Sequence, residues 1–382
     1  MGKRVAIVGI GTTGFRATTP DVSYRELTYE AAVKAYLDAG IEPKEVGAFV
    51  ATSEDFIEGY SISDEYSPDQ LGAVLRPIHT VPGDFLQSLA NGMMLVQSGF
   101  ADLVVVQGLS KASNILNVGE VLTFAEDPVT VRPLRETPHA VAALDMCRFL
   151  HETGTTREQC AQVVVKNRRN ALRNQRAAHG TLLEACDVLA APPVAEPLGR
   201  YDIAQHADGA VVVVLASEER AAHLRRAPVW IRGIGWATDA PSLDSRVWGD
   251  ARYARLAADM AYRMAGIRTP RREIQFAEVN DEYSYKELQH LEALRIYERG
   301  QAGRATEVGA TEPAGEFPVN VSGGSLGCGA TFDLDGGQKL LEVVLQLRGE
   351  AGTPQLRGVT TGLAASWRGV PSATGAVAVL SN

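Results

Sequence analysis

The sequence predicts an α/β fold with a parallel-rich sheet, formed by two copies of one unit of strands and helices. Two observations predict this fold. Apolar, strand-like runs alternate with helix-like segments in the N-terminal part of the chain, and two short motifs recur in the second half at a nearly constant spacing. With 382 residues, of which 45% are hydrophobic, the chain is also long enough to bury two cores.

The expected elements follow from the spacing of apolar residues. The helix expected at 23–39 has Leu27, Ala31 and Ala35 on one face and stops at Gly40, while the run at 102–107 is apolar throughout, as in strands of parallel sheets. The segments predicted in chain order are a strand at 4–10, a helix at 23–39, a strand at 46–52, a polar loop at 55–69, a helix at 86–97, strands at 102–107 and 275–279, and helices at 282–294 and 338–348.

The chain repeats itself. The motif VAIVGIG at 5–11 recurs at 229–235 as VWIRGIG, and AYLDAGI at 35–41 recurs at 261–267 as AYRMAGI, with offsets of 224 and 226 residues. Because both motifs keep nearly one register, chance is a poor explanation. The repeat therefore indicates a duplicated α/β unit.

This duplication predicts the domain organisation. We expect an N-terminal half at 1–225, with an inserted region at about 110–200, and a C-terminal half at 226–382. Equivalent helices of two such halves meet at a pseudo-two-fold axis. The turn at 322–337 should therefore face its first-half counterpart at 80–87.

Charge and cysteine content exclude several classes of protein. A net charge of −9 without clusters of Lys and Arg argues against nucleic acid or an anionic membrane as a partner. The four cysteines lie far apart, with no CxxC pair, which fits reduced thiols in a cytoplasmic protein and gives no sign of a zinc or other metal site. The N-terminus lacks a signal-peptide pattern, and no apolar run approaches membrane-spanning length.

The glycine-rich stretch at 318–337 is where chemistry is expected, because a helix follows it directly. Glycines allow close approach of a ligand to the backbone, and the first N–H groups of a helix are free to bind an anion or an oxyanion. A purely structural loop is an equally good interpretation of the glycines alone. Their order matches neither common phosphate-binding pattern, so a nucleotide phosphate is not expected here.

Further segments complete a resemblance to a known family. The segments VKNRRNA at 165–171, DGAVVVVLASEE at 208–219, VNVSGG at 319–324 and LQLRGEAG at 345–352, together with the repeat, resemble thiolases. The resemblance covers nearly the whole chain and is closest to the sterol-carrier-protein type and its archaeal acetoacetyl-CoA relatives. It implies a five-layered αβαβα thiolase fold, a role in lipid metabolism, and a dimer through the first-half sheet. It also implies a coenzyme A thioester as substrate or ligand, with no covalently bound cofactor.

The sequence departs from this family at each reactive position. No cysteine precedes Cys147, so the nucleophile expected at the start of the helix near 80–88 is missing. The family's His-Asp-Cys-Phe motif aligns with 280–283, so Asn280 replaces an oxyanion-binding histidine and Glu282 replaces an acid/base cysteine. An ordinary thiolase reaction needs a thiolate and a base, so it is not expected from this chain.

The second histidine of the family is also absent. Its Gly-His-Pro motif aligns with Gly329, Ala330 and Thr331, so Ala330 stands in the histidine position. Cys328, just before this motif, matches a residue that is common in archaeal relatives and is not a nucleophile.

The remaining polar residues of these motifs are candidates for catalysis, each with a structural alternative. Asn280 could still donate to an oxyanion, Glu282 could act as a general acid or base if its pocket raises its pKa, and Tyr283 could supply a phenol. Against this, a glutamate at the start of a helix often only complements the helix dipole, and a tyrosine is often core. Asp84 is more simply a helix N-cap than a catalytic group.

The expected ligand contacts come from the glycine-rich turn and the inserted region. The residues predicted to line the substrate site are Asp84, Ser322, Gly323, Gly324, Cys328, Gly329 and Ala330. By the resemblance, the pantetheine arm of coenzyme A would lie between this turn and the basic segment at 166–176.

Three functions remain open. The first is an aldolase-type lyase that cleaves a carbon–carbon bond without a cysteine; thiolase-like aldolases of this kind carry tyrosines in the two histidine positions, which this chain does not. The second is a non-catalytic subunit that binds acyl-CoA or a catalytic thiolase-like chain, as a homodimer or heteromer, together with a small OB-fold/zinc-ribbon protein. The third, least favoured, is an acyltransferase with an unusual nucleophile such as Ser88 or Cys328.

Overall fold

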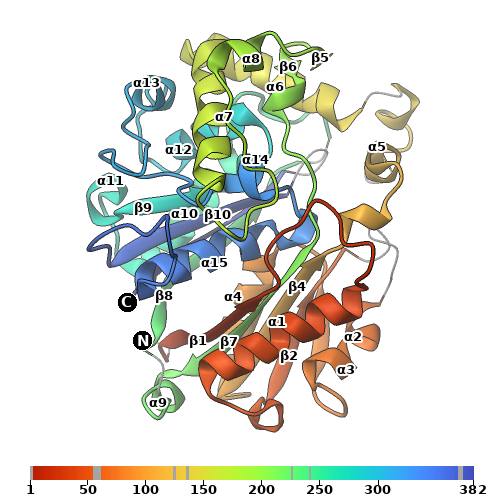
Figure 1. Cartoon of the computed structure of the whole chain (residues 1–382), viewed down its shortest axis with the longest axis vertical. Helices are drawn as coiled ribbons and strands as arrows, with labels where there is room; N and C mark the ends of the chain where they lie inside the picture. The colour runs from red at the N-terminus through yellow and green to blue at the C-terminus, as the bar shows by residue number, and fades with distance from the viewer. Residues whose placement is uncertain are drawn as a thin grey trace.

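Figure 1 shows the computed structural model of the chain, which describes residues 3–54, 62–123, 126–134, 137–224, 227–240, 242–368 and 373–382. The predicted boundary between the halves, at 225 and 226, lies outside the described residues. The strands are β1 (Val5–Thr12), β2 (Ala48–Thr52), β3 (Ile78–Val81), β4 (Leu103–Ser110), β5 (Pro193–Ala195), β6 (Leu198–Gly199), β7 (Gly209–Ser217), β8 (Val229–Thr238), β9 (Phe276–Val279), β10 (Thr361–Arg368) and β11 (Thr374–Ser381).

The helices fall into two groups. The longer ones are α1 (Tyr24–Ala39), α4 (Phe85–Gln97), α6 (Pro138–Thr153), α7 (Arg157–Ala171), α10 (Arg252–Ala265), α12 (Ser284–Ala293) and α15 (Asp335–Arg348). The shorter ones are α2 (Ser63–Tyr66), α3 (Pro68–Leu71), α5 (Val118–Leu122), α8 (Ala185–Leu189), α9 (Glu218–Ala221), α11 (Pro270–Glu273), α13 (Ala302–Glu307), α14 (Gly324–Cys328) and the 3-10 turn η6 (Phe332–Leu334).

The sheet repeats one topology. Its order is β3-β2-β4-β7-β1-β8-β11-β10-β9, and β1 meets β8 over only two residue pairs. Outward from that junction, β7, β4 and β2 in one half correspond to β11, β10 and β9 in the other, with the same parallel or antiparallel pairings. Val319 pairs with Ala277 of β9 at the position that β3 holds beside β2. The two halves are therefore built alike.

The repeated GxG motifs explain how each half packs. A Cβ atom on Gly9 of β1 would lie 2.4 Å from the carbonyl oxygen of Ala35 in α1, and one on Gly233 of β8 would lie 2.1 Å from that of Ala261 in α10. Only glycine lets a helix backbone approach a strand this closely. Each motif thus places one helix against one strand. As predicted, α1 ends at Gly40, which adopts the left-handed conformation.

Three buried cores separate five layers. One core lies between α1 and the outer face of the first-half strands, a second between the two groups of strands around α4 and α15, and a third between the second-half strands and α10. Alternate residues of one strand serve different cores: Val212 and Val214 of β7 face α1, while Val211 and Val213 face the central helices. This is the predicted five-layered αβαβα arrangement.

Two predicted details of secondary structure were wrong. The sheet is not parallel-rich, since three of its strand pairings are parallel and five antiparallel. An apolar run such as β4 indicates burial on both faces, and the helix layers bury antiparallel strands such as β7 equally. The polar loop at 55–69 contains α2 and the start of α3, with Pro68 at the first position of α3, while 55–61 lie outside the described residues.

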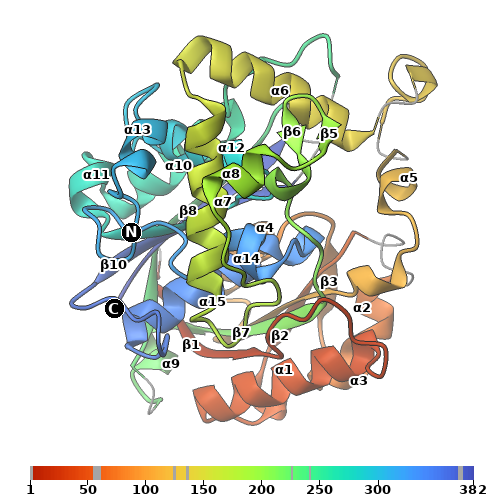
Figure 2. The same ribbon diagram turned by 45° about the horizontal axis from the view of Figure 1, so that its top comes forward.

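The region inserted in the first half covers the second. Figure 2 shows α7 standing beside α12 and α14, with α6, α8 and the hairpin of β5 and β6 around it. Its buried side chains, such as Val163 and Val164, belong to the core of the second half. The insertion therefore brings residues from far away in the sequence to the C-terminal ends of β9 and β10.

Candidate active site

Asp84 joins the two helices whose N-termini meet at the centre of the molecule. As N-cap of α4 it accepts a hydrogen bond from the N–H of Leu86 at 2.8 Å, and its second oxygen accepts from the N–H of Gly336, in the first turn of α15, at 2.8 Å. The hydroxyl of Ser366 also donates to it at 2.5 Å. Burial and then the charge of Asp335 raise the pKa of Asp84 to about 7. The two turns thus face each other as the duplication predicted.

Asn280 follows β9 at its C-terminal end, and its side chain is fully engaged. The amide nitrogen donates to Asp335 at 2.9 Å and to the carbonyl oxygen of Trp367 at 3.5 Å, while the amide oxygen accepts from the N–H of Glu282 at 3.1 Å. The ring of His290 holds the carbonyl oxygen of Asn280 at 3.0 Å. Asn280 therefore fixes the turn that carries Glu282.

Asp281 fills the helix end that the sequence suggested for a ligand. Its carboxylate accepts from the N–H groups of Ser325 and Leu326, in the first turn of α14, and lies 3.6 Å from the ammonium of Lys339. The N-terminus of α15 is likewise bound by Asp84. The expectation that these helix ends are free for an external anion was wrong, because carboxylates of the chain itself occupy them.

Glu282 is different from the other acids of the site. It precedes α12, whose N-cap is Tyr283, so it lies outside the first helical turn and the helix-dipole interpretation does not hold. Its carboxyl is half-buried and makes no hydrogen bond or ion pair with the residues that the structure describes. Burial and then the charge of Asp335 raise the pKa of Glu282 to about 7, although Lys286 and Lys339 oppose the shift. A carboxyl with such a pKa can gain or lose a proton near neutral pH.

Tyr283 is buried beside Glu282, and its hydroxyl reaches the inserted region. The phenol oxygen lies 3.0 Å from Nδ1 of His139, at the start of α6. Trp367, at the end of β10, packs edge-on against the phenol ring with the ring centres 6.0 Å apart. No sequence motif marks His139, which lies 144 residues before Tyr283.

Beside Ala330 lies a second residue that the sequence did not single out. His206 pairs with Ala330 through the backbone, and its ring stacks on Phe332 with ring centres 4.8 Å apart. Nδ1 of His206 and the buried polar atoms of the Thr331 hydroxyl and the Trp367 indole have no hydrogen-bond partner among the described residues. His206 and Thr331 adjoin Ala330, where the resemblance places the second histidine, while Trp367 lies beside Tyr283.

The remaining residues predicted for the substrate site are buried in packing contacts. The hydroxyl of Ser322 donates to Glu278 at 2.5 Å, and the thiol of Cys328 lies 3.4 Å from the carbonyl oxygen of Ser322. Burial and then the charge of Glu342 raise the pKa of the Cys328 thiol far above its usual value.

The glycines of this turn are close-packed too. A Cβ atom on Gly323 would lie 2.6 Å from that of Ala171 in α7, and one on Gly324 would lie 2.3 Å from the Asp281 carboxylate. Gly329 meets Ala207 in the same way, at 2.3 Å. These glycines allow α14 to fit between α7 and the strands.

The basic segment at 166–176 is largely occupied by internal ion pairs. Lys166 pairs with Glu287 at 3.0 Å, Arg169 with Glu312 at 2.6 Å, and Arg176 with Glu342 at 2.8 Å. The Lys166–Glu287 pair is completely buried. Lys166 and Arg169 therefore stabilise the position of α7, and Arg176 that of the loop after it, so none of the three presents an unpaired charge.

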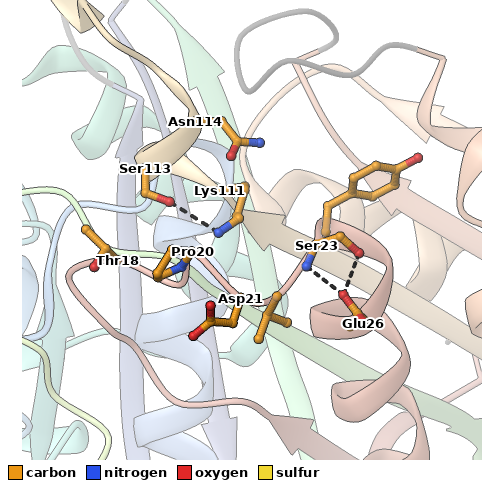
Figure 3. A pocket seen from close by; sticks show the side chains of 10 residues that line it. Thr18, Pro20, Asp21, Ser23, Glu26, Lys111, Ser113 and Asn114 are labelled. Carbon is orange, nitrogen blue, oxygen red and sulfur yellow. Dashed lines mark hydrogen bonds between the residues drawn. The ribbon is translucent and has the colours of Figure 1, made fainter.

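A separate open cavity of about 640 Å³ lies near the start of α1 (Figure 3). None of the predicted site residues lines it. The ammonium of Lys111 at its wall already binds Asp208 at 3.0 Å and the Ser113 hydroxyl at 3.2 Å, and Glu26 caps α1 through Ser23. Lys111 and Glu26 are thus committed to structure. Among the described residues, no helix is both long and apolar enough to cross a membrane.

Comparison with known proteins agrees with this architecture. A family model described as thiolase C-terminal domain-like matches residues 237–382. The acetyl-CoA acetyltransferase of Methanothermobacter thermautotrophicus is 32% identical over 366 residues, which is 94% of each chain. The 17-hydroxy-3-oxo-4-pregnene-20-carboxyl-CoA lyase of Mycobacterium tuberculosis is 28% identical over 389 residues, 97% of each chain. The solved structure of the Ltp2-ChsH2(DUF35) aldolase has a TM-score of 0.85 at 26% identity, covering 99% of this chain and 97% of that one.

These similarities extend along almost the whole chain, and the solved aldolase shares its fold. The similar proteins include an acetyltransferase, a lyase and an aldolase. With a similarity of this extent, the chain belongs to the thiolase superfamily, in a branch similar to archaeal acetyl-CoA acetyltransferase and sterol carrier protein 2, with other side chains in place of the usual catalytic cysteine and histidines.

Proposed function

We propose that this protein is an aldolase-type lyase that breaks or forms a carbon–carbon bond next to an acyl-CoA thioester, without a cysteine nucleophile. The observation that carries the proposal is Glu282, a half-buried carboxyl without a partner among the described residues, whose pKa is raised to about 7. Retro-aldol chemistry requires proton transfer and no covalent acyl-enzyme. The similarity to a lyase and to an aldolase supports the same reaction class.

The proposed reaction cleaves a β-hydroxyacyl-CoA. A base removes the proton of the β-hydroxyl group, the bond between Cα and Cβ breaks, and its electron pair forms an enolate on the thioester. The β-carbon leaves as a ketone or aldehyde. An acid then gives a proton to Cα, so that the acyl-CoA is released and one proton has entered for each proton removed.

Glu282 suits the second of these transfers. As a carboxyl that is half protonated near pH 7, it can donate to Cα of the enolate and regain a proton from solvent. Tyr283, the adjacent residue, is the second proton-transferring group. We assign Asn280 a positioning role, because its amide oxygen holds the N–H of Glu282.

The enolate oxygen needs hydrogen-bond donors. The Thr331 hydroxyl and the Trp367 indole N–H are buried donors without partners among the described residues, and Trp367 packs against Tyr283. A buried polar group without a partner is costly, so its persistence supports a ligand-binding role. Removing one such donor typically lowers the rate on the order of a hundredfold.

An acyltransferase reaction is disfavoured for this chain. Cys328 is buried, and burial raises the pKa of its thiol, so it is not an activated nucleophile. Ser88 is fully buried inside α4. Neither residue has the exposure or the activating base that acyl transfer requires.

The test is direct cleavage of short-chain and bulky β-hydroxyacyl-CoA substrates by the purified protein, followed by chromatography of the acyl-CoA product. We expect release of an acyl-CoA shortened by the fragment that carries the β-carbon. The matched control is thiolysis of a β-ketoacyl-CoA with free coenzyme A, which should not occur. Thiolysis without cleavage would reject the proposal.

A second candidate is a subunit that works only with a partner chain. The solved aldolase named above is a complex with ChsH2(DUF35), which favours an accessory protein for this chain also. The edge strand β3, whose four residues are all half-buried, offers an unpaired strand edge for a second copy or a thiolase-like chain. If the chain is inactive alone and regains cleavage when mixed with a DUF35 protein encoded beside it, this candidate is supported. Light scattering of the chain alone tests for the homodimer.

A further inference from the structure

A hydrogen bond between His139 and Tyr283 joins the inserted region to the candidate site, although no sequence motif indicates it. Nδ1 of His139 lies 3.0 Å from the hydroxyl of Tyr283, and the rings meet edge-on with centres 5.9 Å apart. Tyr283 is 2% exposed, while His139 is only half-buried. The pair therefore runs from the interior beside Glu282 toward the outer part of the inserted region.

Both groups of this hydrogen bond are neutral at neutral pH. Burial, and then the charge of Glu282, raise the pKa of Tyr283 well above its ordinary value, so the phenol keeps its proton at neutral pH. Burial lowers the pKa of His139, so its ring is neutral. A neutral imidazole that accepts at Nδ1 carries its proton on Nε2. In that tautomer the Tyr283 O–H donates to Nδ1, and this is the direction that a proton relay requires.

We propose that His139 serves Tyr283 as positioning residue and proton relay, so that the two act together as the base of the reaction. This inference rests on the proposed function. The β-hydroxyl group gives its proton to the Tyr283 oxygen, while Tyr283 passes its own proton to Nδ1 of His139. The imidazolium then loses its Nε2 proton to solvent. Glu282 remains the acid that protonates Cα, so the two transfers are divided between two groups.

Other titratable groups near the pair do not replace it. Tyr285 on α12 lies with its ring centre 6.3 Å from that of Tyr283, and its hydroxyl is bound to Asp145 at 3.0 Å. His206 lies on the loop before β7. Burial mainly lowers its pKa, and a charge on His139 lowers it further. Among the described residues, His139 is the residue that forms a hydrogen bond with the Tyr283 hydroxyl.

The decisive variants are His139→Asn and Tyr283→Phe, with His151→Asn on the exposed part of the same helix as matched control. An asparagine side chain can offer an oxygen where Nδ1 was, so it keeps an acceptor for Tyr283 but cannot take up a proton. We expect His139→Asn to lower kcat for β-hydroxyacyl-CoA cleavage at least tenfold with little change in KM. The low-pH limb of the kcat profile should disappear. The double variant should be no slower than Tyr283→Phe, because the two groups act as a unit.

A second measurement does not depend on activity. Nitrogen-15 NMR of the imidazole groups should show His139 with its proton on Nε2, and Tyr283→Phe should change its tautomer balance and raise its titration midpoint. Full activity of His139→Asn, or a His139 signal that Tyr283→Phe leaves unchanged, would overturn the relay. A wild-type protein that cleaves no β-hydroxyacyl-CoA would instead overturn the proposed function, and the NMR titration then decides the pair by itself.

Discussion

At the scale of residues, two acids lie where the resemblance to thiolases leads one to expect cysteines: Asp84 near the expected nucleophile, and Glu282 in place of the acid/base cysteine. Asp84 and Glu282 have raised pKa values for the same main reason, burial, but differ in their partners. Asp84 accepts three hydrogen bonds and joins two helices, whereas the carboxyl of Glu282 has no hydrogen-bond partner among the described residues. This difference gives the first carboxyl a structural role and supports our proposal that the second transfers a proton.

The role of Glu282 predicts a specific pH profile. As an acid with a pKa of about 7, it must be protonated for cleavage, so kcat should fall as the pH rises through 7. Glu282→Gln cannot donate a proton, and we expect kcat to drop by roughly a hundredfold or more with the falling limb near pH 7 removed. The measurement is kcat from pH 5.5 to 9 for both proteins. An unchanged falling limb in the variant would assign this proton transfer to another group.

Asp84 should matter for stability and not for restoring thiolase activity. Asp84→Ala removes the α4 cap and leaves the buried N–H of Gly336 without an acceptor, so we expect a loss of about 2 to 4 kcal/mol in the free energy of unfolding. Asp84→Asn keeps one acceptor oxygen and should lose less. Asp84→Cys should show no thiolysis, because Ala330 still stands in a histidine position. Urea denaturation and a thiolysis assay test these expectations, and a fully stable alanine variant would contradict them.

At the scale of elements, the two GxG motifs make a matched pair. Both Gly9 and Gly233 admit a helix carbonyl oxygen where a Cβ atom would stand. We expect Gly9→Ala and Gly233→Ala each to destabilise the protein by about 1 to 3 kcal/mol through overpacking, with nearly additive effects because the sites lie in different halves. Gly119→Ala, where the added carbon meets only an ordinary contact at 3.5 Å, is the control and should be neutral or slightly stabilising. Thermal and urea denaturation of the three variants provide the measurement; equal stability of all three would refute this packing account.

The sequence predicted these elements well because local signals define them. The strand at Val5–Thr12 and the helix at Tyr24–Ala39 follow from apolar runs, spacing and a terminal glycine, and the repeat gave the second set. What it missed depends on contacts between distant segments. No local pattern tells that Asp281 caps α14 across 44 residues, or that His139 meets Tyr283. The stretch from Asn280 to Tyr283 therefore stays a prediction made from the sequence, while the partners of these residues could be found only from the fold.

At the scale of the whole molecule, buried ionisable groups predict how stability depends on pH. Burial, and then the charge of Glu342, raise the pKa of Glu278 to about 8, and Asp84 has a pKa of about 7. Between about pH 4 and these values the folded state binds more protons than the unfolded state, so these acids lower stability as the pH rises. Burial lowers the pKa of His290 to about 3, which has the opposite effect up to about pH 6.5.

The contributions of these acids and of His290 can be separated above pH 6.5. There the two acids still change the free energy of unfolding with pH, and His290 no longer does. We expect the free energy of unfolding to fall from pH 6.5 to pH 8. It should fall less in Glu278→Gln, because the amide does not titrate, and this variant can keep the hydrogen bonds to Ser322. Ser322→Ala serves as control, because it removes a hydrogen bond without removing the titrating group. Urea denaturation at the two pH values decides this; an equal loss in wild type and Glu278→Gln would show that Glu278 does not titrate in this range.

Binding of coenzyme A is the last property that belongs to the molecule as a whole. Because similar proteins are named for CoA thioesters, acyl-CoA is the expected ligand. Any ligand that binds only the folded state raises the free energy of unfolding, by about 2.7 kcal/mol at a concentration of 100 Kd, and the melting temperature rises with it. Because Lys166, Arg169 and Arg176 are already paired with carboxylates, and the chain carries a net charge of −9, phosphate–cation attraction should contribute little. We therefore expect acetyl-CoA and propionyl-CoA to stabilise the protein in a thermal-shift assay. Calorimetry should show an affinity that stays constant or rises between roughly 50 and 500 mM salt, because salt screens the repulsion between the acidic protein and the ligand phosphates. Inorganic phosphate and free acetate are the controls. An affinity that falls tenfold over this range would mean that free cations hold the phosphates after all, and no binding at millimolar acyl-CoA would leave the thiolase scaffold here without its ligand.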